Sequence, residues 1–222
     1  GRNVRESKIG GYGKISFAKA FEVSSNTAMV KLINENYKEN PEKFVDRLYS
    51  MGLNSTLDLP ILGEGIPKII HPTDKKNWDG LDLPWMAFGY GVSLTPLQTL
   101  TFYNAIANDG VMLRPRFLRE VKDFNKKVEI FNKEIINPSI CSKETAKKVQ
   151  KMMQNVVEKK HGTAHNIYSS NFSMAGKTGT CQTEYWKESG LYISSFAGYF
   201  PVENPKYSCI VVIPVSYTHL RA

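Results

Sequence analysis

The last third of the chain holds three β-rich runs in close succession, at residues 172–183, 192–200 and 206–213. Turn-forming segments at 187–190 and 201–205 separate these runs. Strands joined by connections this short pair in antiparallel order, because parallel pairing needs a much longer crossover. We therefore expect a three-stranded antiparallel meander at the end of the chain, and this expectation constrains the fold more than any other feature.

The part of the chain before the meander is mainly helical in pattern. We expect helices at 17–23, 26–36, 42–51, 96–107 and 143–159, an irregular region at 53–92, and short strands with turns at 111–140. Ser16 and Ser142 occupy N-cap positions, and Thr95 with Gln98 forms a capping box. Because helices come first and strands last, the expected fold class is α+β rather than doubly wound α/β.

The composition of the 222 residues excludes several classes of protein. Hydrophobic residues at 41% and aromatic residues at 11% are too many for a disordered chain or a coiled coil. The formal net charge is +8, but the lysines are scattered and no basic run alternates with aromatic residues, so we expect no nucleic-acid partner. Cys141, Cys181 and Cys209 lack the spacing of metal ligands, and we expect neither a metal nor another cofactor.

Two short motifs combine residue types that carry chemistry. Ser24-Ser25-Asn26 lies between two expected helices, and Lys177-Thr178-Gly179-Thr180 lies in the first expected strand of the meander. Each motif alone is weak, because a Ser-x-Asn triplet is often a helix cap and a Lys-Thr-Gly triplet can be a strand edge with a bulge. Their order, separation and settings favour a shared site.

With both motifs in this order, the chain resembles the transpeptidase domain of class B penicillin-binding proteins, of the cell-division type. The resemblance runs over residues 10–213 and includes further matching segments at 20–26, 89–98, 104–110, 162–164, 176–180 and 196–200. It implies a fold like that of the penicillin-binding transpeptidases and serine β-lactamases, with a helical subdomain beside an antiparallel sheet. The sheet is incomplete in this chain, in which we expect three of its strands.

The resemblance implies catalytic roles for three residues. Ser24 relays a proton toward the leaving amine, and Asn26 holds the base lysine and the substrate amide. Lys177 anchors the Ser24 hydroxyl and favours the anionic intermediate through its positive charge.

The same resemblance implies a substrate and the residues that bind it. Thr178 and Thr180 donate to the terminal carboxylate of a peptidoglycan stem peptide ending in D-Ala-D-Ala, and the Thr180 backbone N–H is one of two oxyanion-hole donors. Gly179 lets the peptide lie along the strand edge as an added strand. The implied activity is a serine D,D-transpeptidase that cross-links stem peptides through an acyl-enzyme, and β-lactams acylate the same serine.

The nucleophile motif Ser-x-x-Lys is missing from its expected place. The one match to its letters, Ser16 to Lys19, lies too close to Ser24, and we interpret Ser16 as a helix cap. We therefore expect the nucleophile upstream of residue 1, and we expect residues 1–222 alone to be inactive. Residues 1–213 are then an N-terminally truncated transpeptidase domain, and 214–222 resemble a translated sequencing adaptor, a non-native tail.

Two other functions share these motifs. One is a penicillin-binding sensor domain without catalysis, and the other is a serine β-lactamase, which is disfavoured because no Glu stands in a recognisable deacylation motif. For the transpeptidase, the resemblance implies a membrane-anchored protein with its catalytic domain on the periplasmic or extracytoplasmic side. It also implies cell-division membrane proteins as partners.

Overall fold

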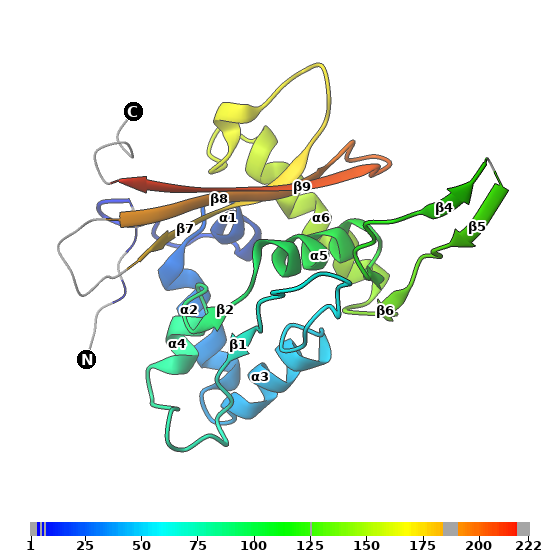
Figure 1. Cartoon of the computed structure of the whole chain (residues 1–222). Helices are drawn as coiled ribbons and strands as arrows, with labels where there is room; N and C mark the ends of the chain where they lie inside the picture. Colours follow the sequence, from blue (N-terminus) through cyan, green and yellow to red (C-terminus); the bar gives the residue numbers. More distant parts are fainter. Residues whose placement is uncertain (1–3, 5, 7, 125, 184–190, 217–222) are drawn as a thin grey trace.

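The computed structural model of the chain describes residues 4, 6, 8–124, 126–183 and 191–216. A three-stranded antiparallel sheet lies over a group of helices (Figure 1). Its strands are β7 (Ala175–Gln182), β8 (Leu191–Phe200) and β9 (Tyr207–Ser216), in the order β7-β8-β9. The predicted meander is thus confirmed, and the connection at 187–190 lies outside the described residues.

Strand β9 continues beyond residue 213, where the sequence led us to end it. Pro214 pairs with Ile193 of β8, and the strand ends at Ser216. Proline lacks a backbone N–H and is tolerated in strands at a sheet edge. Within the described residues β9 is an edge strand, so the proline does not stop the pairing.

The long helices begin where their caps predict. They are α1 (Phe17–Glu22), α2 (Asn26–Tyr37), α3 (Pro41–Ser50), α5 (Pro96–Ala107) and α6 (Lys143–Glu158). Ser16 Oγ accepts from the backbone N–H of Lys19 at 3.2 Å, which confirms its role as a cap. Thr95 and Gln98 form both bonds of the capping box, at 3.1 and 2.8 Å.

Short elements connect these helices. They are β1 (Lys68–Ile69), α4 (Asp82–Met86), β2 (Val92–Ser93), β3 (Met112–Leu113), β4 (Glu120–Asp123), β5 (Lys126–Ile130), β6 (Ile135–Asn137) and the 3₁₀ turn η1 (His165–Ile167). Helix α4 falls in the region expected to be irregular. Leu81 at its N-cap makes no side-chain capping bond and Pro84 lies inside it, so it carries no sequence signal of a helix. The β4–β5 hairpin projects away from the body of the molecule (Figure 1).

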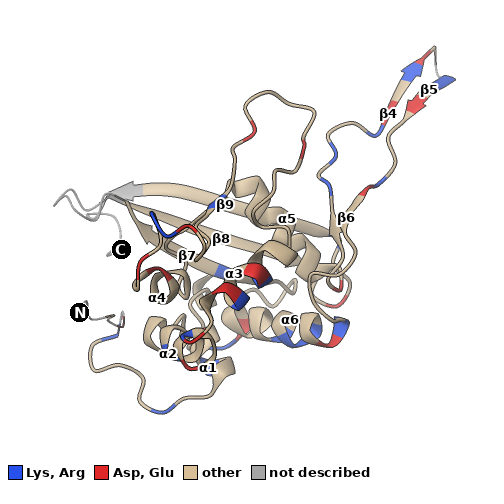
Figure 2. Cartoon of the chain, turned by 90° about the horizontal axis from the view of Figure 1, so that it is seen from below, with Lys and Arg blue, Asp and Glu red and all other residues tan. Residues whose placement is uncertain are grey.

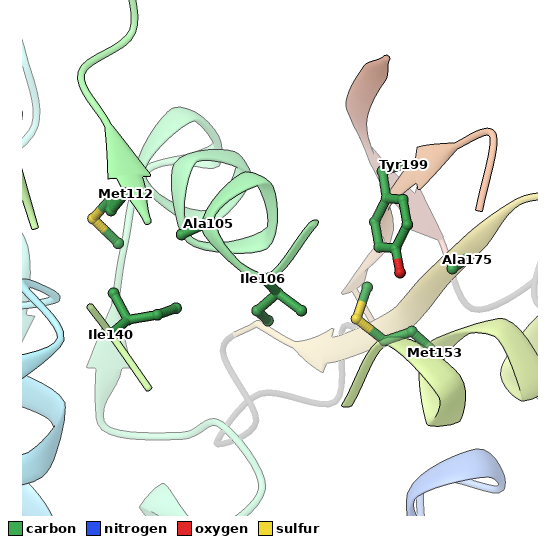
Figure 3. Packing of buried hydrophobic residues seen from close by; sticks show 7 residues of the cluster. All are labelled: Ala105, Ile106, Met112, Ile140, Met153, Ala175 and Tyr199. Atoms are coloured by element: carbon green, nitrogen blue, oxygen red, sulfur yellow. The ribbon is translucent and has the colours of Figure 1, made fainter. Parts of the chain in front are cut away.

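The main core lies between the sheet and helices α5 and α6. Helix α6 packs against β7, while α5 packs against β8 and β9. The buried residues of this core are Ala105, Ile106, Met112, Ile140, Met153, Ala175 and Tyr199 (Figure 3). Fully burying a large apolar side chain contributes about 1.5–3 kcal/mol. This packing fixes β7, the strand that carries the Lys-Thr-Gly motif, on top of α6.

Charged residues of both signs are dispersed over the surface. Figure 2 shows lysine or arginine beside acidic residues on α3, on α6 and along the β4–β5 hairpin. In the part of the chain that the structure describes, no helix combines the length and the apolar character needed to cross a membrane.

Candidate active site

The turn between α1 and α2 presents Ser24. Its backbone has φ 52°, a left-handed conformation that is uncommon for residues other than glycine. The turn is held by backbone bonds from Ser24 N to Phe21 O at 3.2 Å and from Ser25 N to Ala20 O at 2.9 Å. Ser25 is 1% exposed and caps α2 by accepting from Ala28 N at 3.2 Å. Ser25 therefore stabilises the turn, and the side chain of Ser24 faces the cavity described below.

Lys177 of β7 meets this turn. Its Nζ donates to the Ser24 hydroxyl oxygen, although the two residues are 153 positions apart. The same Nζ donates to the Thr178 carbonyl at 3.1 Å and lies 5.8 Å from the centroid of the Phe21 ring. The fold thus brings the Ser-x-Asn and Lys-Thr-Gly motifs together.

Burial changes the acidity of this lysine. Removal from water disfavours the charged amine and lowers the pKa of Lys177 from its ordinary 10.5 to about 8. The amine is therefore still mainly protonated at neutral pH. Its charge is less screened than that of a surface lysine, which strengthens its attraction for an anion formed nearby.

A cavity of about 620 Å³ opens beside this contact. All six residues named from the sequence line it: Ser24, Asn26, Lys177, Thr178, Gly179 and Thr180. Phe21 and Met29 contribute apolar surface on the helical side, and Ala87 with Phe88 closes another part. The volume falls in the range of sites that hold small ligands or short peptides.

Strand β7 borders the cavity with a free edge. It pairs with β8 on one side, and within the described residues no strand pairs with its other side. Gly179 and Thr180 are exposed there. A Cβ on Gly179 would lie 2.6 Å from Ser195 Oγ, so a side chain at this position would crowd the neighbouring strand. Such an edge is suited to bind an extended peptide by backbone hydrogen bonds.

Thr163 and Phe88 line the cavity and Tyr90 contacts Phe88, yet the sequence identified none of the three as a site residue. Thr163 lines the cavity, and its Oγ1 lies 2.6 Å from Thr178 Oγ1. The rings of Phe88 and Tyr90 meet edge to face, with their centroids 5.4 Å apart. The Tyr90 hydroxyl accepts from Gln182 N at 3.3 Å at the end of β7. Burial raises the pKa of Tyr90, so its hydroxyl stays protonated. Residues 89–98 and 162–164 matched the family pattern, but a pattern does not state which atoms meet.

No group of three or more His, Cys, Asp or Glu side chains is arranged to hold a metal ion in the described ranges. The residues that line the cavity offer hydroxyls, an amide, an amine and backbone N–H groups.

Comparison with known proteins gives a consistent result. The sequence profile of the penicillin binding protein transpeptidase domain matches residues 2–220. Stage V sporulation protein D of Bacillus subtilis is 28% identical over 220 residues, which cover 97% of this chain and 32% of that protein. Peptidoglycan D,D-transpeptidase FtsI of Buchnera aphidicola is 30% identical over 173 residues, or 77% of this chain and 28% of that protein.

A solved structure has the same architecture. Penicillin binding protein 3 of Mycobacterium tuberculosis, complexed with aztreonam, superposes with a TM-score of 0.76 at 28% identity. The match covers 90% of this chain and 45% of that one. The present chain spans about a third of the length of the two sequence relatives.

Proposed function

The chain belongs to the family of penicillin-binding protein transpeptidase domains, of class B, and on this premise we propose that it forms part of a peptidoglycan D,D-transpeptidase. The observation that carries the proposal is the hydrogen bond from Lys177 to Ser24 at the wall of the cavity. FtsI, one relative, is named for this activity, and a structural neighbour was solved with a β-lactam.

The reaction begins with a serine nucleophile supplied by a Ser-x-x-Lys motif outside residues 1–222. Its hydroxyl oxygen attacks the carbonyl carbon of the penultimate D-Ala, and a base takes its proton. The C–N bond to the terminal D-Ala breaks, and Ser24 passes a proton to the leaving amine. The amine of a neighbouring stem peptide then attacks the acyl-serine ester, which forms the cross-link and releases the serine.

Lys177 of the Lys-Thr-Gly motif and Asn26 of the Ser-x-Asn motif support this proton transfer. Lys177 holds the Ser24 hydroxyl and adds positive charge where the tetrahedral oxyanion forms, an effect that is strong in a site shielded from water. Asn26 starts α2 at the cavity wall, where its amide both donates and accepts. We assign to Asn26 the role of binding the substrate amide and the lysine of the Ser-x-x-Lys motif.

The strand edge binds the peptide. The stem peptide adds to the free edge of β7 beside Gly179. The Thr178 and Thr180 hydroxyls donate to its terminal carboxylate, and the backbone N–H of Thr180 serves the oxyanion hole. β-Lactams enter the same cavity and acylate the same serine.

We place the catalytic domain on the extracytoplasmic side of the cell membrane, where peptidoglycan is assembled. The whole protein is anchored in that membrane and works with other membrane proteins of cell division. The name of one relative, a peptidoglycan D,D-transpeptidase, supports a catalytic domain on the side where peptidoglycan is assembled.

Labelling with a fluorescent penicillin tests the proposal. We expect the full-length protein to form a covalent adduct that survives denaturation, and peptide mapping to place it on the serine of a Ser-x-x-Lys motif outside residues 1–222. We expect the isolated chain 1–222 to remain unlabelled. An adduct on Ser16 or Ser24 would refute the assignment of roles, and a full-length protein that takes no label would refute the proposed function.

A further inference from the structure

A buried carboxylate lies directly behind the catalytic turn. Glu22 is the last residue of α1, stands two positions before Ser24, and is only 5% exposed. A buried carboxylate is costly unless several donors satisfy it. The role that the family resemblance assigns to this region does not include Glu22, so its burial needs another explanation.

Its donors come from a distant part of the chain. Glu22 Oε1 accepts from Asn155 Nδ2 of α6 at 2.7 Å, and Oε2 contacts His161 Nε2 at 2.6 Å. Burial on its own raises the pKa of Glu22, but the bonds from His161 and Asn155 and the charges of His161 and Lys19 outweigh it, so the pKa is lowered. The carboxylate is therefore ionised and joins α1 to the end of α6.

The turn after α6 is also bonded to the Glu22 backbone. Thr163 N donates to Glu22 O at 3.2 Å, and Ala164 N donates to Val156 O at 3.1 Å. A Cβ on Gly162 would lie 2.1 Å from Val156 O, so the turn is pressed closely against the helix. The turn at 159–164 therefore has little freedom while Glu22 and His161 hold it.

This turn delivers one hydroxyl to the active site. Thr163 Oγ1 lies 2.6 Å from Thr178 Oγ1, and both residues line the cavity. A threonine hydroxyl rotates freely unless a partner fixes it. The contact with Thr163 therefore decides how Thr178 presents its hydroxyl to a ligand.

We propose that Glu22, clamped by His161 and Asn155, is a positioning residue that acts through Thr163 to orient the hydroxyl of Thr178 for the substrate carboxylate. This inference rests on the proposed function, because it assigns the pair of threonines to the ligand of that same cavity. Glu22 itself lies behind the cavity wall and does not contact the ligand.

A double-mutant cycle tests whether Glu22 acts through Thr163. The second-order rate constant of acylation by a fluorescent penicillin is measured on the full-length protein with Glu22→Ala, Thr163→Val and both changes. We expect each single change to slow acylation about tenfold, since small misplacements in an active site cost this much or more. We expect the double variant to be no slower than the worse single one, because both changes break the same chain of contacts.

A double variant that is acylated about a hundredfold more slowly than the wild type would refute the inference, because the two single effects would then be independent. A wild-type rate of acylation in Glu22→Ala would refute it as well. Glu158→Ala is the matched control, because that carboxylate bonds to Gln154 at 2.8 Å within α6 and is expected to leave acylation unchanged.

His161 provides a second test if Glu22→Ala fails to fold, since its side chain is 38% exposed. We expect His161→Ala to slow acylation and His161→Gln, which keeps a donor for Glu22, to restore most of the rate. Equal rates in the wild type and His161→Ala would contradict the inference. An unlabelled wild-type protein would instead refute the proposed function, so the two failures are distinguishable.

Discussion

Replacing Lys177 with methionine should make the folded protein more stable while it removes the charge that we propose acts in catalysis. Burial lowers the pKa of Lys177 from 10.5 to about 8, a difference of 10.5 − 8 = 2.5. At about 1.4 kcal/mol for each pKa unit, the folded state loses roughly 3 kcal/mol at pH 7 by keeping this amine charged. Methionine fills a similar volume without that cost.

The lost hydrogen bond to Ser24 offsets part of this gain. A hydrogen bond made by a charged group contributes about 1.5–3 kcal/mol. We therefore expect Lys177→Met to raise the free energy of unfolding by about 1 kcal/mol at pH 7. Urea unfolding of the full-length protein, followed by tryptophan fluorescence, measures this difference.

The stability advantage of Lys177→Met over the wild type should decrease as the pH rises. Between about pH 8 and 10.5 the unfolded chain binds more protons at Lys177 than the folded one, so the stability of the wild type rises across this window. The advantage of Lys177→Met should then largely disappear by pH 10. A variant that is less stable than the wild type at pH 7, or an advantage that is the same at pH 7 and pH 10, would refute the account of a charged, buried lysine.

Three further changes test contacts near the site and in the helix α5 that supports the sheet. Gly162→Ala should destabilise the protein by about 1–3 kcal/mol, because the new Cβ would lie 2.1 Å from Val156 O, and an unchanged unfolding midpoint would contradict this. Tyr90→Phe removes the acceptor for Gln182 N and should cost about 1 kcal/mol, with a loss of amide protection at Gln182 in hydrogen exchange; unchanged protection would show that the bond is not formed. Thr95→Ala breaks the capping box of α5 and should lower the free energy of unfolding by about 1 kcal/mol, whereas equal stability would remove that cap from the account.

Local signals in the sequence were sufficient to predict most of the elements. The cap at Ser16 and the capping box at Thr95 act within a single helical turn, so three or four neighbouring residues specify them. The meander followed from β-rich runs and the turn at 201–205, which are equally local. Helix α4 was missed because neither a capping side chain nor an uninterrupted helical pattern marks it.

The contacts that build the site are of another kind. The Lys177–Ser24 bond spans 153 positions, and the contact between His161 and Glu22 spans 139. Neither hydrophobic periodicity nor a helix cap predicts contacts between residues so far apart in the sequence. Such contacts depend on how α1, α6 and β7 pack. The first pair was anticipated only through resemblance to a family. The resemblance did not predict the second pair, and the contact between Glu22 and His161 is seen only in the folded structure.

The most direct test of the central claim is to compare acylation in Lys177→Met with that in Lys206→Met. Lys206 is an exposed lysine in the turn between β8 and β9, so its variant controls for the loss of a positive charge. In the full-length protein, we expect penicillin to acylate Lys177→Met about a hundredfold more slowly than the wild type, while Lys206→Met reacts at the wild-type rate. Equal rates in the two variants would show that the contact between Lys177 and Ser24 has no part in acyl transfer.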